Sequence, residues 1–281
     1  MRLVRFGESG WERPGLIDVD GGIRDLSSIV PDLAGEHLSK ASLARIAAAD
    51  RKSLPHIALA RLGPPVGNVR NFIAVGLNYA DHAAETNSKI PAEPILFNKA
   101  PSCIVGPNDP IVIPRGSQKT DWEVELAVVV GETASYVPES EVPDVIAGYT
   151  ICHDVSERAF QLDHGGQWMK GKGCPSFGPL GPWLVTPDEI ADVQRLALWL
   201  DVNGERMQSG STERMIFNIN FLVSYISRFM KLQPGDVITT GTPPGVGMGK
   251  NPPRFLRAGD RVTLGIDGLG AQTQGVANSS P

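Results

Sequence analysis

The sequence predicts a strand-rich α+β protein with a small N-terminal α/β module, residues 1–67, and a larger domain, residues 68–281. A length of 281 residues suits one large domain with a smaller one beside it. Glycine and proline repeatedly interrupt short apolar runs, as in IVGPNDPIVIP, FGPLGPWLV and ITTGTPPGVGMG. This pattern favours many short strands over a helical bundle or a regular βαβ alternation. The stretch LGPPVGNVRN is typical of a connection between the two parts.

Composition restricts the partners that we expect. A formal net charge of −5 with scattered basic residues argues against a nucleic-acid footprint or a polybasic membrane patch. No apolar run approaches the roughly 18 residues of a membrane span, and MRLVRFGESGW lacks the apolar region of a secretory signal, so we expect a cytoplasmic protein. The cysteines, Cys103, Cys152 and Cys174, lack CxxC spacing and are expected to be buried thiols.

The first elements follow in chain order. LVRFG predicts a strand, DVDGG a turn, and SKASLARIAAADRKSLPHIA an amphipathic helix. In the larger domain, Thr186 followed by Pro187, with Glu189 three residues after the threonine, predicts the capped start of a short helix. LALWLDV then alternates apolar residues on one face before Asn203-Gly204, a dipeptide that strongly signals a two-residue hairpin turn.

The last elements are a helix and two strands. Apolar residues recur at helical spacing through MIFNINFLVSYISRFMK, from Ile216 to Met230. The following Pro234-Gly235 predicts that this helix has ended by then. Strands return at DVITTG and DRVTLGID.

The stretch TDWEVELAVVVG places two acids in a strand-like run. Because successive side chains of a strand point to opposite faces, Glu123 and Glu125 share one face, and Trp122, Val124 and Leu126 fill the other. Two adjacent carboxylates in a partly buried place require a proton or a cation between them. An edge strand with a solvated acidic face is the simpler alternative, but the apolar continuation LAVVVG argues against it.

A third acid completes a candidate site for a hard cation. Asp154 ends a strand-like run in YTICHDVSER and is followed by polar residues. Oxygen ligands without a cluster of histidines or cysteines favour Mg²⁺ or Mn²⁺ over zinc, in an open site that substrate oxygens can enter. His153 is either a ligand or a packed core residue. As the neighbour of a ligand on a strand it faces away, which favours the core role.

Two further groups suggest catalysis. If the chain turns helical after Tyr79, His82 and Glu85 stand at i and i+3, where the carboxylate can orient the imidazole as a general base. The alternative is a solvent-facing helix that carries both residues by chance. In WMKGKG, one of Lys170 and Lys172 is expected to reach an anionic substrate, since this stretch is too flexible and apolar for an ordinary solvated helix.

Seven stretches occur in the order seen in the fumarylacetoacetate hydrolase family: GLNYADHAAE, PILFNKAPS, DWEVELAVVVG, GYTICHDVSERAFQ, KGKG followed by FGPLGPWLV, VNGERMQSGST and GDVITTGTPPGVGMG. The chain thus resembles that family over about residues 69–266. The resemblance implies a mixed β-roll or β-sandwich catalytic domain around a central site, a small-molecule 2-oxo acid as substrate, and a homodimer.

By position, the resemblance implies roles for individual residues. Glu123, Glu125 and Asp154 resemble the ligands of a divalent metal, Mg²⁺ or Mn²⁺, in agreement with the argument from the strand face. His82 and Glu85 match the pair that activates water, and Lys172 matches the active-site lysine. Substrate contacts fall on Tyr79, Arg158, Gln161 and Thr242.

Three positions depart from the family pattern. The family often has arginine where Leu77 stands, asparagine where His153 stands and aspartate where Pro175 stands. These departures leave the acids and the water-activating pair intact. They put the shape and polarity of the substrate pocket in question, and residues 86 to 93 are a candidate lid over it.

These parts imply hydrolysis of a carbon–carbon bond in a 2,4-diketo acid. His82 with Glu85 would deliver hydroxide to the remote carbonyl, and a bound cation with Lys172 would neutralise the pyruvate enolate that leaves. The run GKGCPSFGPLGPWLVTPDE resembles members that cleave 2,4-diketo-3-deoxy sugar acids, such as the L-rhamnonate or L-fuconate derivatives, into pyruvate and a hydroxy acid.

Other functions stay open at this point. Hydrolysis of an acylpyruvate or fumarylpyruvate is the alternative within the hydrolases. Oxaloacetate decarboxylation and isomerisation of oxo-diacids use the same scaffold, although the water-activating pair favours a hydrolase. A non-enzymatic binding module with a structural ion is a further class, disfavoured because structural sites are usually closed by protein ligands and only three acids are visible.

Overall fold

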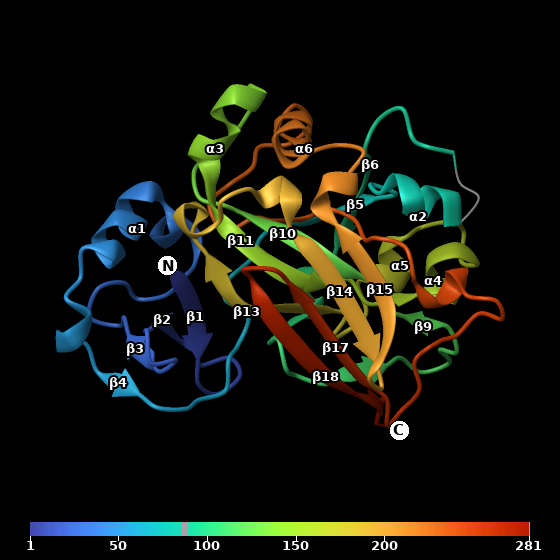
Figure 1. The fold of residues 1–281 in the computed structure, drawn as a ribbon, viewed down its shortest axis with the longest axis horizontal. Coiled ribbons are helices and arrows are strands. Elements are labelled where there is room, and N and C mark those ends of the chain that lie inside the picture. Colours follow the sequence, from blue (N-terminus) through green and yellow to red (C-terminus); the bar gives the residue numbers. More distant parts are fainter. Residues whose placement is uncertain (86–88, 281) are drawn as a thin grey trace.

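The computed structural model describes residues 1–85 and 89–280. It is a strand-rich α+β fold, as the sequence predicts, in which two large sheets pack against each other (Figure 1). No helix within these two ranges has the length and apolar character needed to cross a bilayer. Residues 86–88 of the candidate lid lie outside the described residues.

The larger sheet has eleven strands in the order β4-β3-β2-β1-β13-β11-β10-β16-β5-β6, with β7 paired to β13. Its strands are β1 Arg2–Phe6, β2 Arg13–Ile17, β3 Ile23–Asp25, β4 His56–Ile57, β5 Phe72–Gly76, β6 Ile95–Lys99, β7 Ile104–Val105, β10 Val124–Val130, β11 Ile146–His153, β13 Gly178–Val185 and β16 Val237–Thr239. β1 pairs with β13, so the N-terminal strands continue the sheet of the larger domain. The domain boundary after residue 67 stays a prediction.

The second sheet has five strands in the order β15-β14-β17-β18-β8. They are β8 Ile111–Ile113, β14 Ala197–Val202, β15 Glu205–Ser211, β17 Arg261–Ile266 and β18 Gly270–Asn278, while β9 Thr120–Asp121 and β12 Ser156–Glu157 form a separate pair. The predicted hairpin is confirmed, because Asn203 and Gly204 join β14 to β15 with φ angles of 54° and 81°. Both angles lie in the left-handed region that a tight hairpin turn requires.

The helices are short: α1 Lys40–Ala47, α2 Ala80–Glu85, α3 Val142–Val145, α4 Arg158–Leu162, α5 Met169–Lys172 and α6 Ile219–Ile226. The helix predicted from Ile216 onward begins later than its apolar pattern. The backbone N–H of Ile216 bonds to the Asn78 carbonyl instead, and the Asn218 side chain caps α6 by accepting the N–H of Phe221. α6 also ends at Ile226, short of the expected end near Met230.

The predicted capped helix at Thr186 is wrong in its cap and its length. Only one 3₁₀ turn forms, Pro187–Glu189, and Thr186 makes no side-chain cap bond. The Thr186 hydroxyl accepts a hydrogen bond from the N-terminal amine of Met1 instead. A tertiary contact thus replaces the local one.

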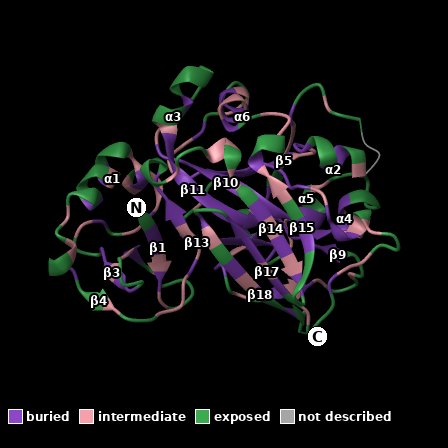
Figure 2. Cartoon of the chain, viewed as in Figure 1, coloured by how far each residue is buried: buried purple, intermediate pink, exposed green. Residues whose placement is uncertain are grey.

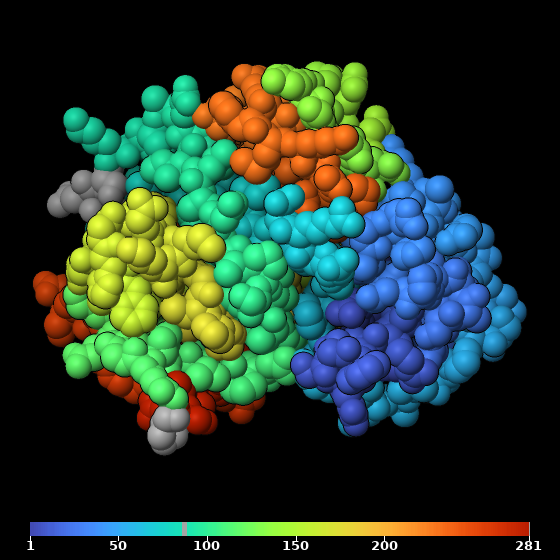
Figure 3. Space-filling model, turned by 180° about the vertical axis from the view of Figure 1, so that it is seen from behind, coloured from blue at the N-terminus to red at the C-terminus, as the bar shows by residue number. Residues whose placement is uncertain are grey.

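The core lies between the sheets, where the long strands are buried (Figure 2). β10 is buried along its whole length and pairs with β11 on one side and β16 on the other, so it is a central strand. Helices α2, α4 and α5 gather near one end of these strands (Figure 1). From behind, the yellow segment of α4 and α5 lies beside the teal segment of β6 (Figure 3).

Candidate active site

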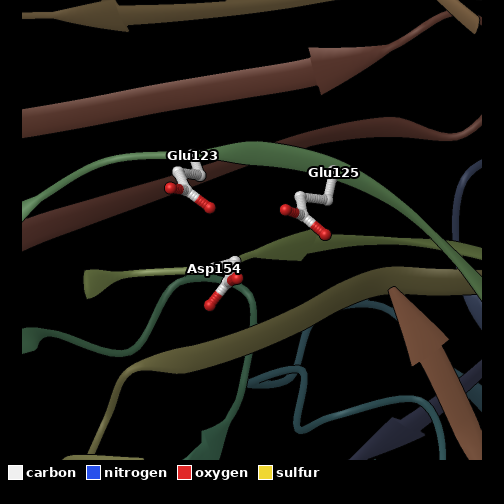
Figure 4. Close-up of side chains that lie close together, drawn as sticks. All are labelled: Glu123, Glu125 and Asp154. Atoms are coloured by element: carbon white, nitrogen blue, oxygen red, sulfur yellow. The ribbon is translucent and has the colours of Figure 1, made fainter. Parts of the chain in front are cut away.

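Three carboxylates meet where β10 begins and β11 ends (Figure 4). Glu123 directly precedes β10, Glu125 is its second residue, and Asp154 directly follows β11. The Asp154 N–H donates to the Glu123 carbonyl at 2.9 Å, which holds the two chain segments together. One oxygen of each acid lies within 4.8 Å of the other two, and all three residues are buried. The alternative of an edge strand with a solvated acidic face is therefore wrong.

Two buried lysines contact these acids. Lys172 Nζ donates to Glu123 Oε2 and to Asp154 Oδ2, each at 2.7 Å. Lys99 Nζ donates to Asp154 Oδ1 at 2.6 Å and also to the carbonyl of Lys172. Lys172 belongs to the single helical turn α5, and it is buried there, so this turn is not an ordinary solvated helix. Lys170 bonds to a backbone carbonyl at the surface, which leaves Lys172 as the lysine of the site.

Arg158 is held on three sides. Its Nε donates to Asp121 Oδ2 at 2.8 Å, its Nη2 to Glu123 Oε1 at 2.7 Å and its Nη1 to Gln161 Oε1 at 3.1 Å. A guanidinium fixed in this way orients the carboxylates that it contacts. The sequence prediction of a substrate contact at Arg158 did not include this structural role.

The charges of this cluster do not balance. Among the described residues it contains four buried carboxylates and three buried cations: Asp121, Glu123, Glu125, Asp154, Lys99, Arg158 and Lys172. Burial, and then the negative charges of Asp154 and Glu123, raise the pKa of Glu125 well above its usual value. Burial acts the same way on Glu123, but the positive charges of Lys172 and Arg158 outweigh it and lower the pKa of that carboxyl.

A divalent metal ion fits this donor set. One negative charge is left over in a buried place, where a proton or a further cation has to supply the balance. The donors that converge are carboxylate oxygens, which Mg²⁺ and Mn²⁺ prefer. Glu123, Glu125 and Asp154 are the residues that would hold the ion.

The second polar group lies on α2, which forms where the sequence predicts it. His82 Nδ1 lies 3.0 Å from Glu85 Oε2, so the two residues pair at i and i+3. His82 is 7% exposed and lines the same cavity as the three acids. A carboxylate at Nδ1 fixes the orientation of the ring.

A glycine-rich loop, residues 241–249, connects the two groups. Its backbone N–H groups donate to three different acids: Gly241 to Glu125 at 3.0 Å, Gly245 to Glu85 at 2.9 Å, and Gly247 and Met248 to Asp121 at 2.6 and 3.0 Å. Sequence reasoning missed Asp121, although the alternation that places Glu123 and Glu125 on one face also places Asp121 there. The loop therefore couples the acids of β10 to the helix that carries His82.

A cavity of about 270 Å³ lies in front of these groups. Its polar lining comprises His82, Glu123, Glu125, Asp154, Arg158, Gln161, Lys172 and Thr242, so three of the four predicted substrate contacts reach it. Tyr79 is not among the lining residues. It is fully buried, and its hydroxyl has no hydrogen-bond partner within the described part of the chain, so a substrate contact there is not supported.

Of the three departures, only Leu77 lines the cavity. His153 faces away from the acids, as expected from the strand alternation, and its Nδ1 lies 3.0 Å from Gln274 Oε1. Burial lowers the pKa of His153 to about 4, so its ring is neutral at physiological pH. Pro175 is not among the described lining residues. The change at Leu77 is therefore the one that alters the pocket wall directly.

Three buried acids and a histidine paired with a glutamate, facing one cavity of a strand-rich fold, define an enzyme active site. The sequence matches the model described as Fumarylacetoacetate (FAA) hydrolase C-terminal over residues 71–277. The chain belongs to the fumarylacetoacetate hydrolase family, as its seven stretches predict.

Known proteins of similar sequence or structure agree with this assignment. A relative from Burkholderia ambifaria, provisionally named a hydrolase, is 58% identical over 281 residues, with 99% of this chain and 100% of the relative covered. Fumarylacetoacetate hydrolase from Exiguobacterium antarcticum is similar at 36% identity and a TM-score of 0.88, over 99% of this chain and 100% of that one.

Two further solved structures show that different reactions occur on this fold. Maleylpyruvate hydrolase from Sphingobium sp. SYK-6, solved with manganese(II) and pyruvate, is 29% identical with a TM-score of 0.83 and full coverage of both chains. A 5-carboxymethyl-2-hydroxymuconate delta-isomerase from Mycobacterium smegmatis is 34% identical with a TM-score of 0.80, also with full coverage of both chains.

Proposed function

We propose that this chain is a metal-dependent hydrolase that cleaves a carbon–carbon bond in a 2,4-diketo acid to give pyruvate and a second acid. The observation that carries the proposal is the single cavity shared by the buried acids, with their excess negative charge, and the His82 and Glu85 pair. The manganese and pyruvate in the similar maleylpyruvate hydrolase support the cation and the product. The resemblance to the family suggests two substrate groups for this reaction, 2,4-diketo-3-deoxy sugar acids and acylpyruvates.

The roles of the residues follow from their positions. Mg²⁺ or Mn²⁺ held by Glu123, Glu125 and Asp154 would supply positive charge that stabilises the enolate left on pyruvate. Lys172 Nζ, 2.7 Å from two of these carboxylates, adds a fixed positive charge beside the same place. His82, oriented at Nδ1 by Glu85, takes a proton from water as the water oxygen adds to the C4 carbonyl.

The bond changes balance without any further reactant. Water adds to C4, the C3–C4 bond breaks, and its electron pair stays on C3 of the pyruvate half. The proton taken by His82 returns to C3, so that one water is consumed and the two products are a carboxylic acid and pyruvate.

A homodimer remains part of the proposal, and light scattering in solution tests it.

Replacing the proposed base distinguishes hydrolysis from decarboxylation. We expect His82→Ala to lower pyruvate release from 2,4-diketo acids by about 10²–10⁴-fold, since general base catalysis typically contributes that much. Oxaloacetate decarboxylation needs no attacking water and should survive the change. The exposed His56, on β4 and outside the cavity, gives the matched control His56→Ala, which should keep full activity. Undiminished diketo acid cleavage in His82→Ala contradicts the assigned base.

A further inference from the structure

We infer that this site selects a neutral, apolar acyl tail, so that the preferred substrate is a monocarboxylic acylpyruvate. The inference rests on the proposed function and narrows its substrate class. It excludes polyhydroxylated tails, such as those of sugar acids, and tails that end in a second carboxylate.

The wall of the cavity beyond the charged cluster is apolar. Among the described lining residues it is formed by the side chains of Val75, Leu77, Phe97, Leu162, Trp168 and Met248. An acyl chain against these residues leaves water for an apolar surface, which is favourable in proportion to the area buried.

The aromatic part of this wall is held in place by packing. The rings of Phe97 and Trp168 meet edge to face with centroids 5.2 Å apart. A Cβ at Gly76 would come within 2.5 Å of the Trp168 ring, so the absence of a side chain there lets the indole press against β5. Lys172 Nζ lies 5.3 Å from the Phe97 ring centroid, so the aromatic wall begins next to the charged cluster.

Two polar groups of the lining, the Thr242 hydroxyl and the Gln161 side-chain oxygen, already have protein partners. Thr242 Oγ1 donates to the Val124 carbonyl at 2.9 Å and accepts from Gln208 Nε2 at 2.8 Å. The Gln161 carbonyl oxygen accepts from Arg158, whose guanidinium is held by acids as well. A hydroxyl on the substrate tail would exchange water for apolar side chains, at a loss of affinity on the order of tenfold for each unpartnered group.

Charge balance argues against a second carboxylate. The buried cluster carries one excess negative charge, and a bound dication changes this to one excess positive charge. The carboxylate of a 2-oxo acid neutralises it. A second carboxylate at the tail would stay uncompensated, because the lining cations Arg158 and Lys172 are already paired with Asp121, Glu123 and Asp154.

The test separates binding of the tail from the reaction. Titration calorimetry with the Mn²⁺-loaded protein compares 2-oxoheptanoate, 2-oxoheptanedioate and 5,6,7-trihydroxy-2-oxoheptanoate, which share a chain length. We expect 2-oxoheptanoate to bind at least about tenfold more tightly than either other acid. Equal or tighter binding of the dicarboxylate or the trihydroxy acid overturns the inference. Pyruvate release from the corresponding 2,4-diketo acids tests the proposed function separately, so either statement can fail alone.

A variant with a new cation in the wall sharpens the result. Met248→Lys replaces one long unbranched side chain of the wall by a charged one, and Met248 binds Asp121 only through its backbone. The affinity ratio of 2-oxoheptanedioate to 2-oxoheptanoate should rise about tenfold or more in this variant. Leu59→Lys adds the same charge at a position 91% exposed and outside the cavity, and should leave the ratio unchanged. An unchanged ratio in Met248→Lys places the tail elsewhere and overturns the inference.

Discussion

Glu125 is the acid of the cluster whose charge is least compensated. Burial and two neighbouring carboxylates raise its pKa well above the usual value, and its Oε2 accepts a hydrogen bond from the backbone N–H of Gly241. Glu125→Gln removes this repulsion while keeping the shape of the side chain. We expect the metal-free variant to melt about 2 °C or more above the wild type, yet to lose its stabilisation by Mn²⁺ and its turnover. Thermal melts with and without Mn²⁺ measure both effects.

The pH dependence of that difference has a definite sign. A carboxyl whose folded pKa is raised stabilises the fold fully below its unfolded pKa of about 4.3, and this stability is lost as pH rises through the folded pKa. Glutamine imitates the protonated form at every pH. The metal-free wild type and Glu125→Gln should therefore melt alike at low pH and diverge as pH rises, with the variant more stable. A difference that shrinks with rising pH contradicts this assignment.

Lys99 is a buried cation that stabilises the same acidic cluster. It is 1% exposed, and its ammonium bonds to Asp154 and to the backbone of Lys172. Lys99→Met leaves a buried carboxylate with one cation fewer, so we expect a loss of about 3–5 kcal/mol in the free energy of unfolding. The control Lys119→Met breaks an exposed pair with Asp163 and should cost less than about 1 kcal/mol. Urea titration compares them, and equal losses contradict a structural role for Lys99.

At this scale the sequence predicts acids better than their cations. Glu123, Glu125 and Asp154 stand out because carboxylates in apolar strand runs need an explanation, and the structure brings them together. Lys99 lies 55 residues before Asp154 at the end of a short strand, and only the fold makes them partners. The run ILFNK contains a signal for this lysine, because strand alternation places the charged Lys99 on the same face as the apolar Phe97.

The glycine-rich loop is the element that joins α2, which carries the proposed base, to the acids of the proposed metal site. Gly245 has a φ of 108°, and a Cβ there would lie 2.0 Å from the Met207 carbonyl oxygen. Its N–H also bonds to Glu85. We expect Gly245→Ala to displace the loop and to lower kcat at least about tenfold, since a misplacement of 1 Å can cost about a hundredfold.

Gly259 provides the matched control for that change. Its φ of 95° is similar, but nothing lies within 4 Å of a Cβ at this position. Gly259→Ala should therefore cost only backbone strain, on the order of 1–3 kcal/mol in stability, and leave kcat unchanged. Equal kcat values for the two variants contradict a positioning role for the loop.

Local patterns predict elements well where the stabilising contacts are also local. The hairpin at Asn203-Gly204 is such a case, since the turn residues alone require positive φ. The cap at Thr186 and the start of α6 are decided by partners far away in sequence, Met1 and Asn78, so local signals mislead there.

For the whole molecule, the strand-rich class follows from the sequence but the strand order does not. The central strands β10, β11, β13 and β16 pair across long stretches of chain, and β1, at the N-terminal end, joins β13. Periodicity identifies such strands without naming their neighbours. The arrangement of the strands is implied by the resemblance to a family. The inference about the substrate tail depends on the residues that line the cavity, which the sequence does not identify.

The most direct measurement of the central claim is pyruvate release by metal-stripped protein from a panel of 2,4-diketo acids, before and after addition of Mg²⁺ or Mn²⁺. The excess negative charge of the acidic cluster predicts no release without metal and release with it, fastest for apolar acylpyruvates. Release at full rate from the stripped protein, or none from any diketo acid with either metal present, contradicts the account.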